Sequence, residues 1–329
     1  MTDALIDYGL FLAKTLTVLA FLGLLLMLAL RARRGGHQDG DRLDVTCLNE
    51  HYRGLAHDLR RASNPRKQYE RSLKEEHKAD KAREKTKEVR TRLFVIDFAG
   101  DIKATEASAL REIITAILME AREGDSVLIR LENAGGLVHE HGLAASQLTR
   151  LRAKGIPLTI AVDKVAASGG YLMAVVANRI LAAPFAVVGS IGVVAQLPNF
   201  HRVLERHGVD YELHTAGDYK RTLTLFGENT EAGREKLRRQ LEETHALFKG
   251  FIQEYRPGLD LAQVATGEHW HGSQALSLGL IDAIQTSDDF LLAAAETSDL
   301  YQISYAAHKK PLERLLSSLS QALVTRLRA

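Results

Sequence analysis

The sequence predicts an α/β protein with a mostly parallel sheet and helical crossovers. Between about residues 92 and 290, short apolar runs with the length of buried strands alternate with amphipathic segments. This alternation is typical of a sheet whose strands are joined through crossover helices. Glycine-rich turns follow two of the apolar runs, at residues 133–136 and 167–170. In a parallel sheet such turns emerge at the same edge, where ligands bind.

Composition limits the classes of protein that fit this chain. Its 329 residues allow one large domain or two ordinary ones, with appendages. The net charge of +2 is too close to zero to indicate nucleic acid as a partner. The one cysteine, Cys47, rules out an intrachain disulfide, although a lone thiol does not decide the compartment.

The N-terminal segment has the character of a membrane anchor. Residues 9–30 are almost entirely apolar, and their number matches one helical crossing of a bilayer. The one charge inside this run, Lys14, lies near its end and can extend to the interface. Asp3 and Asp7 precede the run in place of a basic patch, which argues against a cleaved signal peptide. We therefore expect residues 1–34 to form an uncleaved, single-pass anchor in the lipid bilayer.

A charge-dense segment follows, at residues 35–91. Its lysines and arginines are interleaved with aspartates and glutamates, many of them at helical spacing. This pattern predicts a charged helical linker or stalk. Its basic side chains are candidates for contact with anionic lipid head groups, and a plain spacer is the simpler interpretation.

The globular part begins near Arg92 and ends near residue 290. Beyond it, residues 291–329 are expected to form a C-terminal extension with a strand past about residue 300 and a basic amphipathic tail. Hydrophobic periodicity within the globular part predicts strands at 93–98, 125–131, 157–163 and 179–183, helices at 107–122, at 142–153 and from 171, a long charged helix at 230–255, a turn at 267–272 and a short helix from 273.

Ser168 occupies the turn between a predicted buried strand and an apolar helix that opens at Tyr171. A serine in this position lies at the positive end of the helix dipole, beside unpaired backbone N–H groups. Such a setting suits a nucleophile whose attack creates an oxyanion. The backbone N–H groups of Gly136 and Gly169 are candidates to converge on that oxygen. The alternative interpretation is that Ser168 is only a helix N-cap.

A nucleophilic serine needs a base, and two residue types qualify. His139, His141, His269 and His271 lie near glycines, and a Ser-His-Asp triad is open on spacing alone. Their alternate spacing is a weak metal signal and no HExxH motif is present, so we expect no metal. Lys220 is the other candidate, although a lysine serves as a base only where desolvation or nearby positive charge keeps it neutral.

Three segments occur in order: Ala167-Ser168-Gly169-Gly170-Tyr171, Gly189-Ser190-Ile191-Gly192-Val193 and Gly217-Asp218-Tyr219-Lys220. Together they resemble the signal peptide peptidase A family of serine–lysine proteases, which have the crotonase/ClpP-like fold. The similarity spans about residues 92–290, and it implies that these residues form the peptidase domain. The N-terminal anchor and the single protease domain are most similar to one branch of inner-membrane members.

The resemblance implies a role for each matching residue. Ser168 matches the nucleophile and Lys220 the general base, while Ser190 matches a serine that hydrogen-bonds the lysine and orients it. Gly136 and Gly169 match the oxyanion donors. No cofactor is implied.

One turn departs from the family pattern. Asn133-Ala134-Gly135-Gly136 stands where the family usually has Ser-Pro-Gly-Gly. A proline would fix one φ angle of this turn, so its loss loosens the turn while the glycines remain. Arg221 also stands where the family often has serine.

The resemblance implies a membrane-anchored serine endopeptidase with a Ser-Lys dyad. Its substrates would be peptides or unfolded proteins with hydrophobic or signal-peptide-like segments, and it would form a homo-oligomer. Three alternatives are a crotonase-fold acyl-CoA enzyme, a non-catalytic membrane scaffold and a Ser-His-Asp peptidase.

Two observations disagree on the side of the membrane. Arg31, Arg33 and Arg34 follow the apolar run directly, which favours a cytoplasmic peptidase domain. The resemblance is to enzymes of the bacterial inner membrane that work in the periplasm, and long domains cross despite local charge. We expect a periplasmic domain, with the cytoplasm as the alternative.

Overall fold

The computed structural model describes residues 9–23, 27, 42–86, 90–217 and 219–306. Residues 9–23 form a helix, and the predicted anchor extends beyond the described residues. Among the helices described, none has both the length and the apolar character that a bilayer crossing requires. The larger of two compact units, Leu43–Tyr305, contains the sheet.

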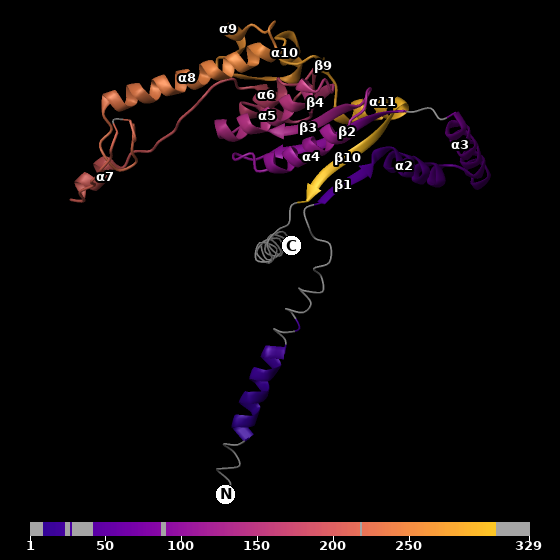
Figure 1. The fold of residues 1–329 in the computed structure, drawn as a ribbon, viewed down its shortest axis with the longest axis horizontal. Helices are drawn as coiled ribbons and strands as arrows, with labels where there is room; N and C mark the ends of the chain where they lie inside the picture. The colour runs from indigo at the N-terminus through magenta and orange to yellow at the C-terminus, as the bar shows by residue number, and fades with distance from the viewer. Residues whose placement is uncertain (1–8, 24–26, 28–41, 87–89, 218, 307–329) are drawn as a thin grey trace. The chain divides into compact units, whose positions relative to one another are not determined.

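A ten-stranded sheet forms the centre of this unit (Figure 1). Its main path has the order β1-β10-β2-β3-β4-β6-β9, and β5, β7 and β8 branch from β3. Every pairing from β10 to β9 along the main path is parallel, as the sequence predicts. The strands are β1 Arg42–Cys47, β2 Thr91–Gly100, β3 Ser126–Asn133, β4 Leu158–Val162, β5 Val165–Ala167, β6 Arg179–Ala182, β7 Val187–Gly189, β8 His269–His271, β9 Ala283–Ile284 and β10 Ser298–Ala306.

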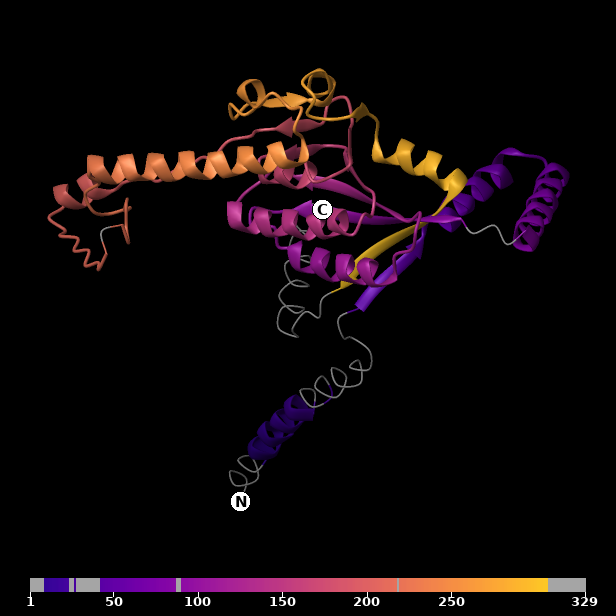
Figure 2. The same ribbon diagram turned by 45° about the horizontal axis from the view of Figure 1, so that its top comes forward.

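The helices at 107–122, 142–153 and 230–255 are confirmed, with small shifts at their ends. Figure 2 shows α4 and α5 side by side along the sheet, and both α4 with α5 and α5 with α6 are in contact. The helices are α2 Leu48–Ser63, α3 Arg66–Thr86, α4 Ala107–Glu120, α5 Val138–Ala153, α6 Gly169–Ala174, α7 His201–Arg206, α8 Glu231–Tyr255, α9 Leu261–Val264, α10 Gly272–Ser277 and α11 Ser287–Thr297.

Both faces of the sheet are buried, and β2 shows why. Successive side chains of a strand point to opposite faces. Phe94 and Ile96 belong to the large core shared with α4, α5 and α6, whereas Leu93 and Val95 belong to a smaller core under α2 and α11. A parallel sheet covered in this way has strands that read as continuous apolar runs.

Short strands are the elements that the sequence pattern did not reveal. β5 and β7 have three residues each, which is too few for a period to show. The segment 267–272, expected as a turn, contains β8, which pairs antiparallel with β7. The close approach of β8 depends on Gly189, because a Cβ added there would lie 2.8 Å from the Trp270 ring.

The segments on either side of the expected peptidase domain join the sheet. The predicted stalk contains two helices, but β1 pairs with β10 at the sheet edge and runs in the opposite direction (Figures 1 and 2). The boundary expected at residue 290 lies inside α11, and β10 pairs with β2.

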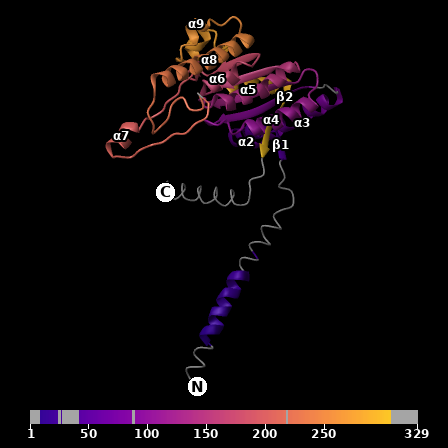
Figure 3. The same ribbon diagram turned by 60° about the vertical axis from the view of Figure 1, so that its left-hand side comes forward.

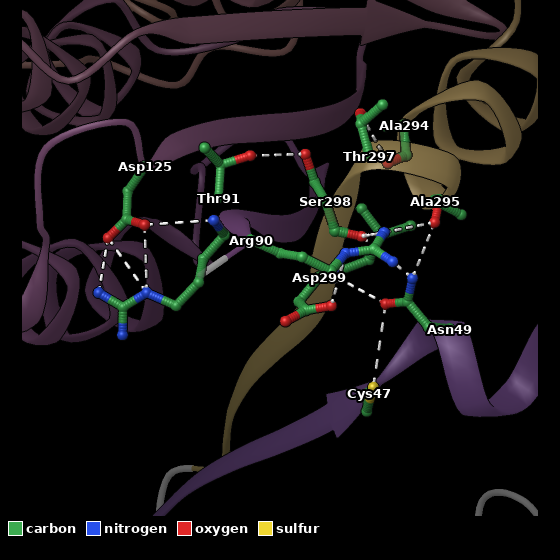
Figure 4. Close-up of polar contacts among 12 residues, drawn as sticks. Cys47, Asn49, Arg90, Thr91, Asp125, Ala294, Ala295, Thr297, Ser298 and Asp299 are labelled. Atoms are coloured by element: carbon green, nitrogen blue, oxygen red, sulfur yellow. Dashed lines mark hydrogen bonds and ion pairs between the residues drawn. The ribbon is translucent and has the colours of Figure 1, made fainter. Parts of the chain in front are cut away.

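Asn49 fastens α2 to this edge (Figure 4). Its Nδ2 donates to the carbonyl oxygens of Ala295 and Ser298, at 3.3 and 3.1 Å, and the Leu300 N–H donates to its Oδ1 at 2.7 Å. Local charge patterning cannot reveal such bonds, because their partners lie some 250 residues away.

An arm, defined here as residues 194–217 and 219–230 and including α7, extends from the core beside α8 (Figures 1 and 3). It packs on itself, since the rings of Phe200 and Phe226 stack with centroids 6.1 Å apart. The buried residues of α8, Phe248 and Ile252, lie in its C-terminal half, which contacts α6. The N-terminal half of α8 contacts the arm.

Candidate active site

Ser168 stands in a strained backbone conformation at the start of α6. Its φ is 52° and its ψ is −117°, which an L-residue adopts at a cost of about 1–3 kcal/mol. Its N–H donates to the Gly189 carbonyl oxygen at 2.8 Å. Its side chain makes no capping hydrogen bond to α6, so Ser168 is not the helix cap that was the alternative interpretation. Strain of this kind without a capping bond is typical of an active-site residue.

The two glycine turns meet at one edge of the sheet, as the parallel topology predicts. A Cβ added to Gly135 would lie 2.7 Å from the Ser168 Cβ and 3.0 Å from the Gly169 nitrogen. Gly135 also has a φ of +92°, which favours glycine. A Cβ on Gly136 would lie 2.7 Å from the Ile102 carbonyl carbon. Both glycines are therefore required by close backbone approach.

A cavity of about 300 Å³ opens beside these turns. Ser168, Gly169 and Gly136 line one part of it, and α5, α6 and α8 supply apolar side chains to the rest. The apolar lining residues are Val138, Ala145, Leu172, Val193, Leu247, Phe248 and Phe251. Such a cavity is suited to an apolar side chain of a substrate.

Ser190 lies next to Ser168 because two short strands are paired. The β5–β7 ladder places Ala167 opposite Gly189, so the next residues along each strand are the two serines. Ser190 also has a positive φ, of 51°, and its N–H donates to the Glu268 carbonyl oxygen at 2.6 Å. The sheet branch thus brings together two strained serines that are separate in the sequence.

Lys220 is not brought to Ser168 within one chain. It lies in the arm, where the ring of the preceding Tyr219 is 5.1 Å from the Lys236 Nζ. Lys236 precedes Thr244, the first cavity residue of α8, by eight residues, which is about 12 Å of helical rise. Lys220 is exposed, and its side chain has no hydrogen bond to any residue that the structure describes.

The histidines do not form a triad with Ser168. His139 is exposed beside Glu140, and the His271 Nδ1 lies 3.2 Å from the Phe185 carbonyl oxygen. No described histidine hydrogen-bonds to Ser168, and the described residues include no cluster suited to a metal ion.

His141 differs from the other three candidate histidines, which are exposed. It is fully buried, and its Nε2 lies 3.1 Å from the Asn133 Oδ1. The sequence carries a signal for this, since His141, Ala144, Ala145 and Leu148 follow the spacing of a buried helical face. The helix was expected to begin at residue 142, and its earlier start at Val138 places His141 on that face.

These features define the class of protein. A strained serine stands at a strand-to-helix turn, beside a glycine turn and an apolar cavity, at the edge of a mostly parallel sheet. A serine with only a structural role would not need a strained backbone. The arrangement is that of a serine hydrolase.

Comparisons with known proteins specify the family. The N-terminal model of peptidase family S49 matches residues 3–148, and the peptidase family S49 model matches residues 150–301. The chain is 46% identical over 326 residues to the "Probable protease SohB" of Haemophilus influenzae, covering 95% of this chain and 92% of that protein. It is also 46% identical over 323 residues to the protein of that name from Buchnera aphidicola subsp. Acyrthosiphon pisum, covering 98% and 96%. The chain belongs to peptidase family S49 and is a serine protease.

Among solved structures, a membrane-bound stomatin-specific protease matches with 14% identity and a TM-score of 0.42, over 63% of this chain and 85% of that chain. A second structure of that protease, in complex with a substrate peptide, matches with 13% identity and a TM-score of 0.41, over 71% and 99%.

Proposed function

We propose that this serine protease is a membrane-anchored endopeptidase in which Ser168 and Lys220 form the catalytic dyad. The observation that carries the proposal is the strained turn of Ser168, packed against the Gly135-Gly136 turn at the rim of an apolar cavity. The peptidase unit has a crotonase/ClpP-like core, and residues 1–34 are its anchor.

The reaction begins when the neutral amine of Lys220 accepts the proton of the Ser168 hydroxyl. The Ser168 Oγ then bonds to the peptide carbonyl carbon, and the Gly136 and Gly169 N–H groups stabilise the oxyanion. When the tetrahedral intermediate collapses, the C–N bond breaks and Lys220 returns its proton to the leaving amine. A water molecule gives a proton to Lys220 and attacks the acyl carbon. The bond from that carbon to the Ser168 Oγ then breaks, Lys220 returns the proton to the Oγ, and the second product leaves.

Lys220 reaches Ser168 from a neighbouring copy of the chain in this proposal. Within one chain, the helical rise of α8 separates the arm from the cavity. The arm also exposes apolar side chains, among them Val194, Val203 and Tyr219, which suit a surface that a second copy covers. The protease is therefore a homo-oligomer, and Ser190 orients the incoming lysine.

The substrates are peptides or unfolded segments with apolar side chains. The lining of the cavity favours an apolar side chain next to the cleaved bond, as in signal-peptide-like segments. We place the enzyme in the bacterial inner membrane with its peptidase domain in the periplasm. A reporter enzyme fused after Ala329, active on one side of the membrane only, tests that position.

Two other functions are less consistent with the site. An acyl-CoA enzyme of this fold needs no nucleophile, whereas family S49 and the strained Ser168 both indicate one. A Ser-His-Asp peptidase needs a histidine on Ser168, and no described histidine is bonded to it.

The test is cleavage of an apolar fluorogenic peptide by the full chain in detergent. Ser168→Ala and Lys220→Ala are each expected to lower kcat by at least about 10³-fold, since each removes a partner of the bond-making step. A fluorophosphonate should label wild-type Ser168. Ser108→Ala and Lys154→Ala, at exposed positions outside the site, are the matched controls and should retain the wild-type rate. Full activity of either dyad variant would refute the dyad.

A further inference from the structure

We propose that His141 is a positioning residue that, together with Asn133, clamps the turn 133–137 at both ends and holds its oxyanion donor against Ser168. This inference rests on the proposed function, because His141 acts through the Gly136 and Gly169 N–H groups assigned there. His141 itself touches no substrate atom.

The clamp consists of two contacts from one imidazole ring. The Nε2 of His141 lies 3.1 Å from the Asn133 Oδ1, at the start of the turn. Its Nδ1 lies 3.0 Å from the Leu137 carbonyl oxygen, at the end of the turn. Both partner atoms are acceptor oxygens and a neutral imidazole has one N–H, so one contact is a hydrogen bond and the other is a packing contact of the same ring. Both His141 and Asn133 are completely buried, so water does not compete for that hydrogen bond.

Asn133 connects His141 to the glycine turn. Its Oδ1 accepts a hydrogen bond from the Gly135 N–H at 2.7 Å, which fixes the oxygen and not the nitrogen of the amide on this side. Its backbone pairs with Ala166, two residues before Ser168. The side-chain oxygen of Asn133 is therefore shared between His141 and the turn that carries Gly136.

His141 also supports the second turn. A Cβ added to Gly169 would lie 2.6 Å from the His141 Cδ2, so the ring packs directly behind the residue that follows Ser168. One side chain thus bonds to the 133–137 turn and packs on the Ser168–Gly169 turn. A change in its position would move one oxyanion donor relative to the other.

The turn depends on such side-chain bonds. Its sequence between Asn133 and Leu137 is Ala-Gly-Gly, and two adjacent glycines leave the backbone more freedom than any other pair. It contains no proline to fix a φ angle. The hydrogen bonds of Asn133 and His141 supply that restraint instead.

The experiment separates positioning from simple stability. His141→Phe fills the space but removes both ring nitrogens, and Asn133→Leu removes the shared acceptor. Each is expected to lower kcat roughly 10- to 100-fold with KM within about twofold, because oxyanion stabilisation acts in the transition state. Affinity for a peptide boronate, whose adduct places an oxygen in the same position, should fall by a similar factor. Peptide affinity in the Ser168→Ala background should not change.

Two further variants sharpen the test. The double variant His141→Phe/Asn133→Leu should lose no more than the worse single variant, because both residues act through one network. His139→Phe, on the exposed side of the same helix turn, is the matched control and should leave kcat unchanged.

Wild-type kcat in His141→Phe, additive losses in the double variant, or a rise in KM alone would overturn the clamp. If His141→Phe does not fold, Asn133→Leu, which removes the acceptor at the other end of the same contact, is judged by the same criteria. If wild-type protein neither cleaves peptides nor labels at Ser168, the proposed function fails, and amide exchange then tests the clamp. The Gly135 N–H should exchange roughly tenfold faster in the His141 variant, and an equal rate would refute the inference.

Discussion

Backbone strain is concentrated at the residues proposed for catalysis. Of the three non-glycine residues with positive φ in the part of the chain that the structure describes, two are Ser168 and Ser190. Each follows directly after the last pair of the β5–β7 ladder, Ala167 and Gly189, so both strained residues lie in the turns that leave these strands. Gly135 presses against Ser168 from the opposite turn. The position of the nucleophile is therefore set by backbone contacts and not by a side-chain bond.

Gly135→Ala should show how closely these turns must approach. Its φ of +92° strains any Cβ, and that Cβ would lie 2.7 Å from the Ser168 Cβ. We expect a loss of about 1–3 kcal/mol in the free energy of unfolding together with at least a tenfold loss of kcat. Gly155→Ala is the matched control, since its φ is +76° and a Cβ there meets no atom within 4 Å. Denaturant unfolding measures the free energy of unfolding of each variant, and peptide cleavage measures its kcat. Equal effects of the two variants on kcat would contradict the argument.

At the scale of elements, an ion pair ties β2 to the connection between α4 and β3. Arg92 on β2 donates through Nε and Nη2 to Asp125, and the Arg122 N–H donates to the same carboxylate at 2.8 Å. Asp125 is 4% exposed. Burial by itself raises the pKa of Asp125, but the hydrogen bonds from Arg92 and Arg122 outweigh it and hold the pKa below its ordinary value. The charged form therefore stabilises the fold.

Asp125→Asn should lower the free energy of unfolding by about 1–3 kcal/mol at pH 7. Because the folded pKa lies below the unfolded value of about 3.9, the contribution is present above that pH and is lost as the pH falls through the folded pKa. The difference between wild type and variant should accordingly shrink between pH 4 and more acidic values. Urea unfolding across that range measures it. Asp97→Asn, in a pair with Arg130 that is half exposed, is the control and should cost less than about 1 kcal/mol. A difference in the free energy of unfolding between wild type and Asp125→Asn that stays constant with pH would refute the assignment to Asp125.

At the scale of the whole molecule, the arm keeps the proposed base away from the proposed nucleophile of its own chain. Lys220 lies beside the N-terminal half of α8, and Ser168 faces the C-terminal half. Tyr219, next to Lys220, contacts Lys236 in that N-terminal half, whereas the cavity residues of α8 begin at Thr244. An assembly in which each arm reaches a neighbour would bring the two groups together.

Subunit mixing tests this arrangement. Ser168→Ala and Lys220→Ala chains, each inactive alone, should regain activity when they are co-expressed and assemble together. With random mixing of equal amounts, about a quarter of the sites combine an intact serine from one chain with an intact lysine from its neighbour. Peptide cleavage by the co-purified complex, with each chain carrying a different tag, measures the recovery. No recovery in a complex that contains both chains would show that the dyad forms within one chain.

Local patterns in the sequence determined much of this protein. The apolar runs and amphipathic segments predicted the parallel sheet, its main strands and the helices α4, α5 and α8, because a strand covered on both faces is a continuous apolar run and a helix on a sheet has one apolar face. The strand-to-helix turn of Ser168 and the meeting of two glycine turns followed from the same topology. These are short-range consequences of chain chemistry, and they need no knowledge of distant partners.

Tertiary structure alone decided the rest. The strands β5, β7 and β8 are too short to carry a period and exist because their partners align them. The pairing of β5 with β7 brings the turns of Ser168 and Ser190 to one place, His141 is buried because α5 begins a turn earlier than its pattern indicates, and Lys220 lies in the arm beside the N-terminal half of α8. In each case the deciding contact joins residues whose separation in space is set by packing, which a linear sequence does not display.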